Sequence, residues 1–241
     1  MWEPKGTMTK YAMPALRKTW RSATLAVSLF AVSMLTVSVS VTAAEPKPAG
    51  TGGSAEAGAA KNVTCIACHG PNGNSVNPEW PSIAGQNANY LAEQIKLVRD
   101  NKRVNVLMYP MVKDLTDQDA QDLGAYYASQ TPTGLEADPS YWKAGEKLYR
   151  GGDVARSIPA CMACHGPVGR GNPAAAYPAL RAQHAVYTSK QLDAYAAETR
   201  YMKDAKGRVQ AGPNVQIMAA VAARLTAEDR RNLASYIQGM R

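Results

Sequence analysis

Two pentapeptides carry the residues with the clearest chemistry: Cys65-Ile66-Ala67-Cys68-His69 and Cys161-Met162-Ala163-Cys164-His165. They contain all four cysteines and two of the three histidines of the chain. A Cys-x-x-Cys-His unit is typical of c-type haem attachment, in which two thiols form thioethers to the haem and the histidine ligates the iron. The sequence therefore predicts two covalently attached haem c groups, with His69 and His165 as iron ligands.

The same cysteines allow two other interpretations. Paired Cys-x-x-Cys units could build a four-sulfur zinc site, and one unit alone could act as a dithiol redox pair. Neither alternative explains why both units end in histidine, so haem attachment is preferred.

The N-terminal segment has the pattern of a targeting sequence. Five basic residues precede an apolar, uncharged run over residues 23–41, which ends in Thr42-Ala43-Ala44. This order predicts a secretory signal peptide over residues 1–44 and export to an oxidising compartment. The run is also long enough to span a bilayer, so a retained membrane anchor is the alternative. Residues 45–55 are then a flexible lead-in rich in Pro, Gly and Ser.

Charge gives no reason to expect a nucleic-acid partner. The whole chain carries a formal charge of +8, but the leader holds five of the 27 basic and one of the 19 acidic residues, which leaves +4. The four propionates of two haems would bring the exported protein close to neutrality. The remaining Lys and Arg are scattered, which is typical of solvated faces.

An internal repeat organises the chain. The two haem motifs are offset by 96 residues, and further matches follow at offsets of 97 and then 110. The matches at 97 join Pro81, Gln86, Tyr90 and Gln94 to Pro178, Gln183, Tyr187 and Gln191. The repeat predicts two domains, residues 56–130 and 140–241, joined by a turn-rich linker over residues 131–139. The second domain has a 13-residue insertion, which is placed around residues 204–213.

The predicted elements are helices. Thr116 and Thr226 each precede an Asp by three residues, which is typical of a capped helix start. Apolar residues then recur at helical spacing through Leu123 and Leu233. A further helix is predicted over residues 141–149, ended by Gly151-Gly152. Since no run of alternating strands is present, the predicted fold class is all-α.

The sixth iron ligand can be chosen from the repeat. Six methionines lie outside the leader, and only Met108 and Met218 stand in register at an offset of 110. A methionine thioether on the second face of a haem gives an electron-transfer site, whereas an open position invites catalysis. Met108 and Met218 are therefore the predicted ligands, with Met111 as the alternative in the first domain.

Three more residues have a predicted place near the haems. Pro81 and Pro178 follow their motif histidines by 12 and 13 residues, and their carbonyl oxygens could accept the second imidazole N–H. An ordinary turn proline explains the spacing equally well. His184 is expected to be a surface or hydrogen-bonding residue, with an interdomain role as the alternative.

From about residue 55 onward the chain resembles the cytochrome c4 family of dihaem class I cytochromes c. The matching stretches are residues 65–71 and 161–167, 80–86, 145–152, 177–180 with 183–185, and 217–239. The resemblance implies two cytochrome c folds related by a pseudo-twofold axis, Met108 and Met218 as sixth ligands, and support of the histidines by Pro81 and Pro178. One departure is Arg181-Ala182, where the family usually has Ala-Gly.

The resemblance also implies a function. Such proteins carry electrons in the periplasm, or on its membrane face, from the cytochrome bc complex to terminal oxidases. The expected function is thus an exported dihaem electron carrier with no catalytic residues. A dihaem peroxidase or thiosulfate-type dehydrogenase is the enzyme alternative, and a dihaem subunit of a membrane oxidase or dehydrogenase is the other.

Overall fold

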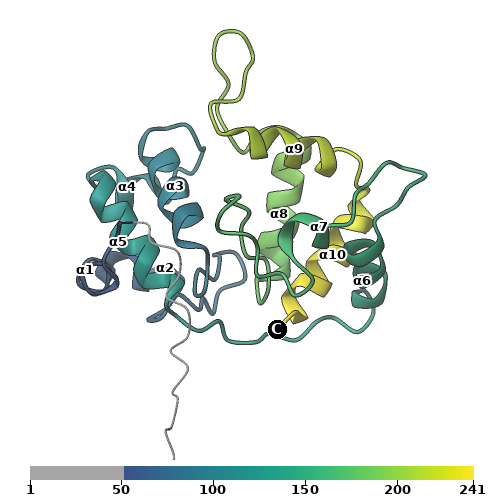
Figure 1. Cartoon of the computed structure of the whole chain (residues 1–241), viewed down its shortest axis with the longest axis horizontal. Coiled ribbons are helices and arrows are strands. Elements are labelled where there is room, and N and C mark those ends of the chain that lie inside the picture. The colour runs from purple at the N-terminus through teal and green to yellow at the C-terminus, as the bar shows by residue number, and fades with distance from the viewer. Residues whose placement is uncertain (1–51) are drawn as a thin grey trace, which may run out of the picture. The chain divides into compact units, whose positions relative to one another are not determined.

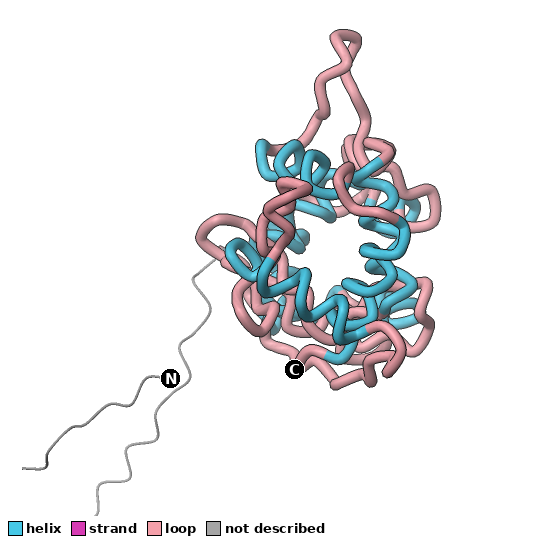
Figure 2. The backbone as a smooth tube through the Cα atoms, turned by 90° about the vertical axis from the view of Figure 1, so that its right-hand side faces the viewer, coloured by secondary structure: helices cyan, strands magenta, loops and turns pink. Residues whose placement is uncertain are grey.

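The described part of the chain is helical. The structure, a computed structural model, describes residues 52–241 (Figure 1). Within that range the backbone forms helices and loops without strands, apart from isolated backbone bridges (Figure 2). The predicted all-α class is confirmed. No helix in residues 52–241 is long and apolar enough to cross a membrane. The predicted signal peptide lies outside the described residues.

Within the described residues, five helices belong to each half (Figure 1). The first half contains α1 (Ala55–Lys61), α2 (Val63–His69), α3 (Ala88–Arg99), α4 (Tyr109–Val112) and α5 (Asp117–Ala128). The second half contains α6 (Trp142–Gly151), α7 (Met162–His165), α8 (Ala185–Ala196), α9 (Pro213–Ala222) and α10 (Ala227–Gly239). Helix α1 begins at Ala55, which is the last residue of the predicted lead-in.

The closing helices start where the sequence predicts. The side chains of Thr116 and Thr226 each accept a hydrogen bond from the backbone N–H three residues on, and Asp119 and Asp229 bond back to the threonine N–H. These are capping boxes, which satisfy two of the N–H groups that a helix start leaves unpaired. The predicted apolar stripes are buried, with Leu123 and Leu233 at their centres.

Each half brings its first and last helices into close contact through one glycine. A Cβ added at Gly58 in α1 would lie 2.1 Å from the carbonyl oxygen of Asp122 in α5. A Cβ at Gly145 in α6 would lie 2.0 Å from the carbonyl oxygen of Asn232 in α10. Since both obstacles are backbone atoms, only a residue without a side chain allows this packing.

We expect Gly145→Ala to lower the free energy of unfolding by about 1–3 kcal/mol, the usual range for overpacking a tight site. Alanine favours helix by about 1 kcal/mol over glycine, but the Asn232 carbonyl cannot move without parting α6 from α10. Gly151→Ala is the matched control, because Gly151 lies in the same helix and nothing lies within 4 Å of its added Cβ. Denaturant unfolding of both variants tests this, and equal stabilities would contradict it.

Two hydrophobic cores form, one in each half. The first contains Leu91, Ala92, Ile95, Val98, Val112, Ala120, Leu123 and Tyr127. The second contains Leu148, Tyr149, Ile158, Leu192, Leu225, Leu233, Tyr236, Ile237 and Met240. In both, the first cysteine of the haem motif and the predicted methionine ligand pack at the edge of the core.

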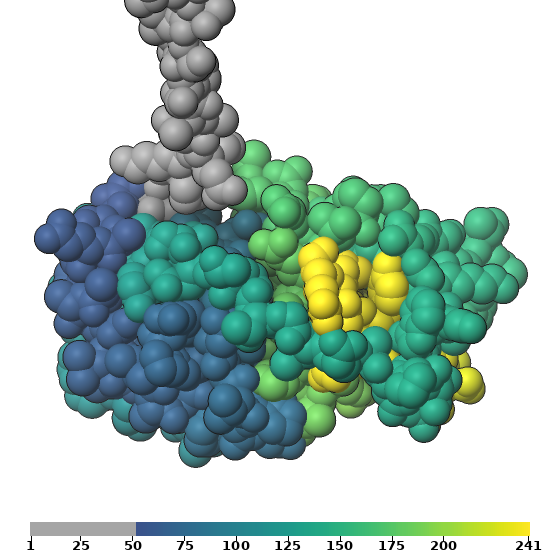
Figure 3. Space-filling view, turned by 90° about the horizontal axis from the view of Figure 1, so that it is seen from below, coloured from purple at the N-terminus to yellow at the C-terminus, as the bar shows by residue number. Residues whose placement is uncertain are grey.

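The halves meet directly, as Figure 3 shows, and the third histidine lies in their interface. His184 is only 7% exposed, and its Nε2 is 2.7 Å from the carbonyl oxygen of Ser75 in the other half. Its repeat counterpart Asn87 donates from Nδ2 to the carbonyl oxygen of Tyr177, at 2.7 Å. His184 is therefore a hydrogen-bonding residue, as one part of the prediction states, but it is buried and not on the surface, and the interdomain alternative describes its position.

The extra residues of the second half form a hairpin, which projects at the top of Figure 1. Lys203 pairs with Val209 within the hairpin, and Tyr201 pairs with Arg103 of the first half. The hairpin overlaps the predicted insertion around residues 204–213 but begins slightly before it. Its base adds backbone hydrogen bonds between the halves.

Candidate haem-binding sites

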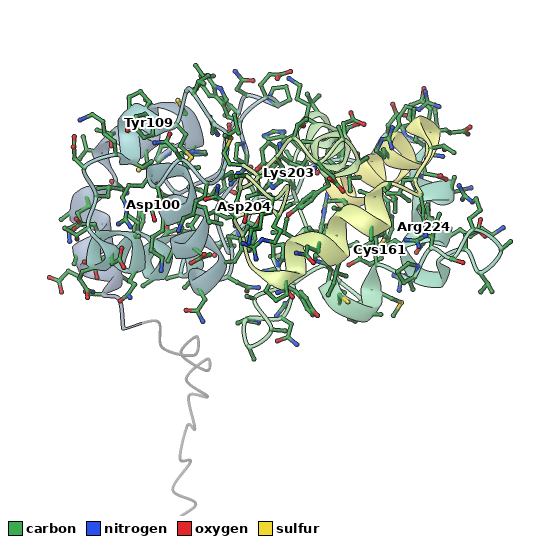
Figure 4. All side chains as sticks on the ribbon, turned by 90° about the horizontal axis from the view of Figure 1, so that it is seen from above. Asp100, Tyr109, Cys161, Lys203, Asp204 and Arg224 are labelled. Atoms are coloured by element: carbon green, nitrogen blue, oxygen red, sulfur yellow. The ribbon has the colours of Figure 1, made fainter. Side chains whose placement is uncertain are left out.

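The two haem motifs are placed alike in their halves. Helix α2 ends at His69 and α7 ends at His165. In each motif the first cysteine is partly buried against the core, and the second is exposed. Figure 4 shows Cys161 beside helix α10. One thiol of each pair is therefore fixed by packing, while the other lies at the surface.

The environments of these cysteines argue against both alternative interpretations. Burial raises the pKa of Cys65, and it raises the pKa of Cys161 to about 11. A redox dithiol needs a thiol whose pKa is lowered towards neutrality. Nowhere in residues 52–241 do three His, Cys, Asp or Glu side chains gather into a group that could hold a metal ion. The zinc interpretation is therefore wrong.

Each motif histidine is held by a proline carbonyl. Nδ1–H of His69 donates to the carbonyl oxygen of Pro81 at 2.8 Å, and Nδ1–H of His165 donates to that of Pro178 at 3.0 Å. Burial lowers the pKa of both histidines, although these hydrogen bonds oppose the shift. A neutral imidazole whose Nδ1 carries the proton has an unprotonated Nε2 with a free lone pair, which is the form that ligates a metal.

The methionines differ in burial. Met108 directly precedes α4 and Met218 lies in α9, and each is partly buried against the core of its half. Met111, the alternative in the first half, has half of its surface exposed. Met240 is buried within the second core, where it fills space.

A cluster of two arginines and several tyrosines occupies the interface. Arg200 is only 5% exposed, and it donates from Nη2 to the Tyr90 hydroxyl at 3.3 Å and from Nε to the Tyr201 hydroxyl at 3.2 Å. Arg103 is half-buried and donates from Nη1 to Gln94 at 3.0 Å and from Nη2 to the Tyr187 hydroxyl at 3.2 Å. Among the described residues no carboxylate pairs with either guanidinium.

This cluster fits a prosthetic group that carries carboxylates. A buried guanidinium without an anion is costly, and Nη1 of Arg200 is buried with no partner in the described structure. Haem propionates would supply the missing charge, so the residues present fit haem. Sequence reasoning did not identify Arg103 and Arg200. Their offset of 97 is that of Tyr90 and Tyr187, so applying the repeat to charged residues would have found them.

Comparisons with known proteins agree with this geometry. The cytochrome c family model matches residues 55–131 and again residues 143–241. Cytochrome c4 of Azotobacter vinelandii is 43% identical over 197 residues, which cover 78% of this chain and 90% of that protein. The chain belongs to the cytochrome c4 family. Its members are dihaem electron carriers, so this protein carries two covalently bound haem c groups and is not an enzyme.

A solved structure supports the cytochrome c4 assignment. The crystal structure of reduced recombinant cytochrome c4 from Pseudomonas stutzeri has a TM-score of 0.72 and 40% identity, covering 78% of this chain and all of that one. A further relative, 34% identical and covering 73% of this chain and 77% of its own length, is the thiosulfate dehydrogenase electron acceptor of Thiomonas intermedia. That name describes an acceptor of electrons, in line with a carrier.

The departure from the cytochrome c4 pattern at Arg181-Ala182 has a local explanation. The first half has Ala84-Gly85 here, and a Cβ at Gly85 would lie 2.6 Å from Pro132. Ala182 has a similar positive φ of 53° but lines a cavity of 350 Å³, which leaves room for its methyl group. Arg181 lines the same cavity, and burial, with nearby Arg170, lowers its pKa. The second half thus carries a positive charge that the first lacks.

Proposed function

We propose that this protein carries electrons in the periplasm from a cytochrome bc complex to a terminal oxidase. The proposed ligands are His69 and Met108 for one iron and His165 and Met218 for the other. The haems, when bound, supply one-electron exchange between ferric and ferrous iron. The observation that carries the proposal is the repetition of one arrangement in both halves, a proline-held histidine with a partly buried methionine in register.

The side chains have separate roles in this scheme. Cys65, Cys68, Cys161 and Cys164 form the thioethers that fix the haems. Pro81 and Pro178 hold each imidazole in one orientation and increase its basicity. Met108 and Met218 would each supply a thioether sulfur, which favours ferrous iron and raises the reduction potential. With histidine and methionine both bound, neither iron would have a position left for a substrate.

The partners and location follow from this role. We propose that residues 1–44 direct export, that residues 56–130 and 140–241 are the two haem domains, and that residues 131–139 link them. If residues 23–41 were kept as an anchor, residues 45–55 would tether the domains to the membrane face. The Thiomonas relative favours a second candidate, in which a periplasmic dehydrogenase is the electron donor.

Two measurements on the purified holoprotein test the proposal: a redox titration, and an assay of cyanide binding to the ferric haems. We expect two one-electron transitions, low-spin spectra in both states, and no cyanide binding at neutral pH. N-terminal sequencing of the mature protein, together with its partition into membranes, tests export and anchoring. Cyanide binding to either ferric haem at neutral pH would contradict the proposed ligation and would return catalysis as the leading function.

A further inference from the structure

Two glutamines in repeat register cross the interface and bind the backbone of the opposite half. Gln86 donates from Nε2 to the carbonyl oxygen of Ala179 at 3.0 Å, and its Oε1 accepts from the Ala179 N–H at 2.9 Å. Gln183 donates from Nε2 to the carbonyl oxygen of Ser82 at 2.8 Å, and its Oε1 accepts from the Ser82 N–H at 2.9 Å. Each side-chain amide thus holds both polar groups of one residue, which fixes that residue in position and orientation.

The residues that are held adjoin the prolines of the haem sites. Ala179 directly follows Pro178, whose carbonyl oxygen accepts from His165. Ser82 directly follows Pro81, whose carbonyl oxygen accepts from His69. The N–H that each glutamine binds belongs to the same peptide group as the proline carbonyl. Because that group is planar, fixing its N–H also fixes its oxygen.

A second contact strengthens this support on one side. Asn87 donates to the carbonyl oxygen of Tyr177, which directly precedes Pro178. Side chains of the first half therefore hold the peptide groups on both sides of Pro178. Gln86 is only 8% exposed, so water competes little for these hydrogen bonds.

We propose that Gln86 and Gln183 are crossed positioning residues, each of which fixes the axial histidine of the opposite half through the peptide group after its proline. The inference rests on the proposed ligation by His69 and His165. A firmly placed carbonyl accepts a stronger hydrogen bond from Nδ1–H, which makes the imidazole a better donor to iron and favours the ferric state. Loss of the glutamine therefore raises the reduction potential of the haem in the other half.

Gln86→Leu and Gln183→Leu holoproteins, titrated against potential, test the proposal. We expect Gln86→Leu to raise the equilibrium constant for reduction of the second haem about threefold, which raises its reduction potential by about 30 mV for one electron. The first haem should keep its potential. Gln183→Leu should give the reverse pattern. Comparison with Met218→Ala identifies which transition belongs to the second haem. Gln86→Glu, which keeps the acceptor and loses the donor, should give a smaller shift than Gln86→Leu.

Lys190→Ala is the matched control, because Lys190 pairs with Glu79 across the same interface and, among the described residues, makes no hydrogen bond to either proline. It should change neither potential. A second readout is the exchange rate of the histidine Nδ1–H proton in the ferrous protein, measured by NMR. Gln86→Leu should speed exchange at His165 and leave His69 unchanged.

Three outcomes would overturn the proposed role of the two glutamines. The potentials of both haems could shift equally, or only the haem of the mutated half could shift. In a folded variant, both the potentials and the proton exchange could also stay unchanged. The proposed carrier function fails differently, through cyanide binding or high-spin iron in the unmodified protein. The two failures are therefore distinguishable.

Discussion

Replacing Cys161 and Cys164 together by serine is expected to leave the second half of the chain unfolded. Both thioethers that would hold the second haem are lost, and Met162, Leu180 and Met218, which pack at the edge of the second core, would lose any cover that a haem gives them. Burial of one large apolar side chain contributes about 1.5–3 kcal/mol. A prosthetic group that covers several such side chains therefore accounts for much of a domain's stability, which is about 5–15 kcal/mol.

Haem content by mass, far-ultraviolet circular dichroism and limited proteolysis measure the outcome. We expect one haem per chain, loss of roughly half of the helical signal, and cleavage sites confined to residues 140–241. Cys161→Ser alone keeps one thioether and should retain the haem with lower stability. A double variant whose second half is natively helical and resists protease would show that the polypeptide packs without its haem.

Much of this fold follows from local sequence. The capping boxes at Thr116 and Thr226 depend on residues three apart, and the helix predicted over residues 141–149 is α6, one residue later at its start and two at its end. The haem motifs depend on five consecutive residues. Such patterns are readable because the interacting groups are neighbours in the chain, so that spacing determines contact.

The interface between the halves was not predictable in the same way. Gln86, Gln183 and His184 are polar, and their sequence patterns resemble those of surface residues. Their burial depends on how one half packs against the other. The periodicity of apolar residues within a single helix does not specify that packing. The repeat does record these positions, since Gln86 and Gln183 are in register. A polar residue that recurs at the same position of both repeats is thus a signal of a symmetric interface between them.

The Arg103 and Arg200 cluster illustrates a different limit. Taken alone, each arginine is one of 27 basic residues in a chain of formal charge +8. Only the structure shows that Arg200 is buried among tyrosine hydroxyls with one nitrogen unpaired. Composition cannot distinguish a solvent-exposed arginine from a buried one that lacks an anionic partner, because the two differ only in the residues around them.

Met218→Ala is expected to lower the reduction potential of the second haem and to abolish its near-infrared sulfur-to-iron band. Removal of the thioether takes away the ligand that favours ferrous iron, and water or another base then occupies the position. The first haem should keep both its potential and its band. Magnetic circular dichroism with redox titration measures both haems, and an unchanged spectrum would remove Met218 from the proposed ligand set.

The first half offers a matched pair for the same question. Met108 is partly buried against the core, whereas Met111 lies one helical turn away and is half exposed. Met108→Ala should abolish the band of the first haem, and Met111→Ala should leave it intact. The reverse result would assign Met111 as the ligand and would break the repeat register. Because both changes remove the same side chain from neighbouring positions, a difference between them reports ligation rather than packing.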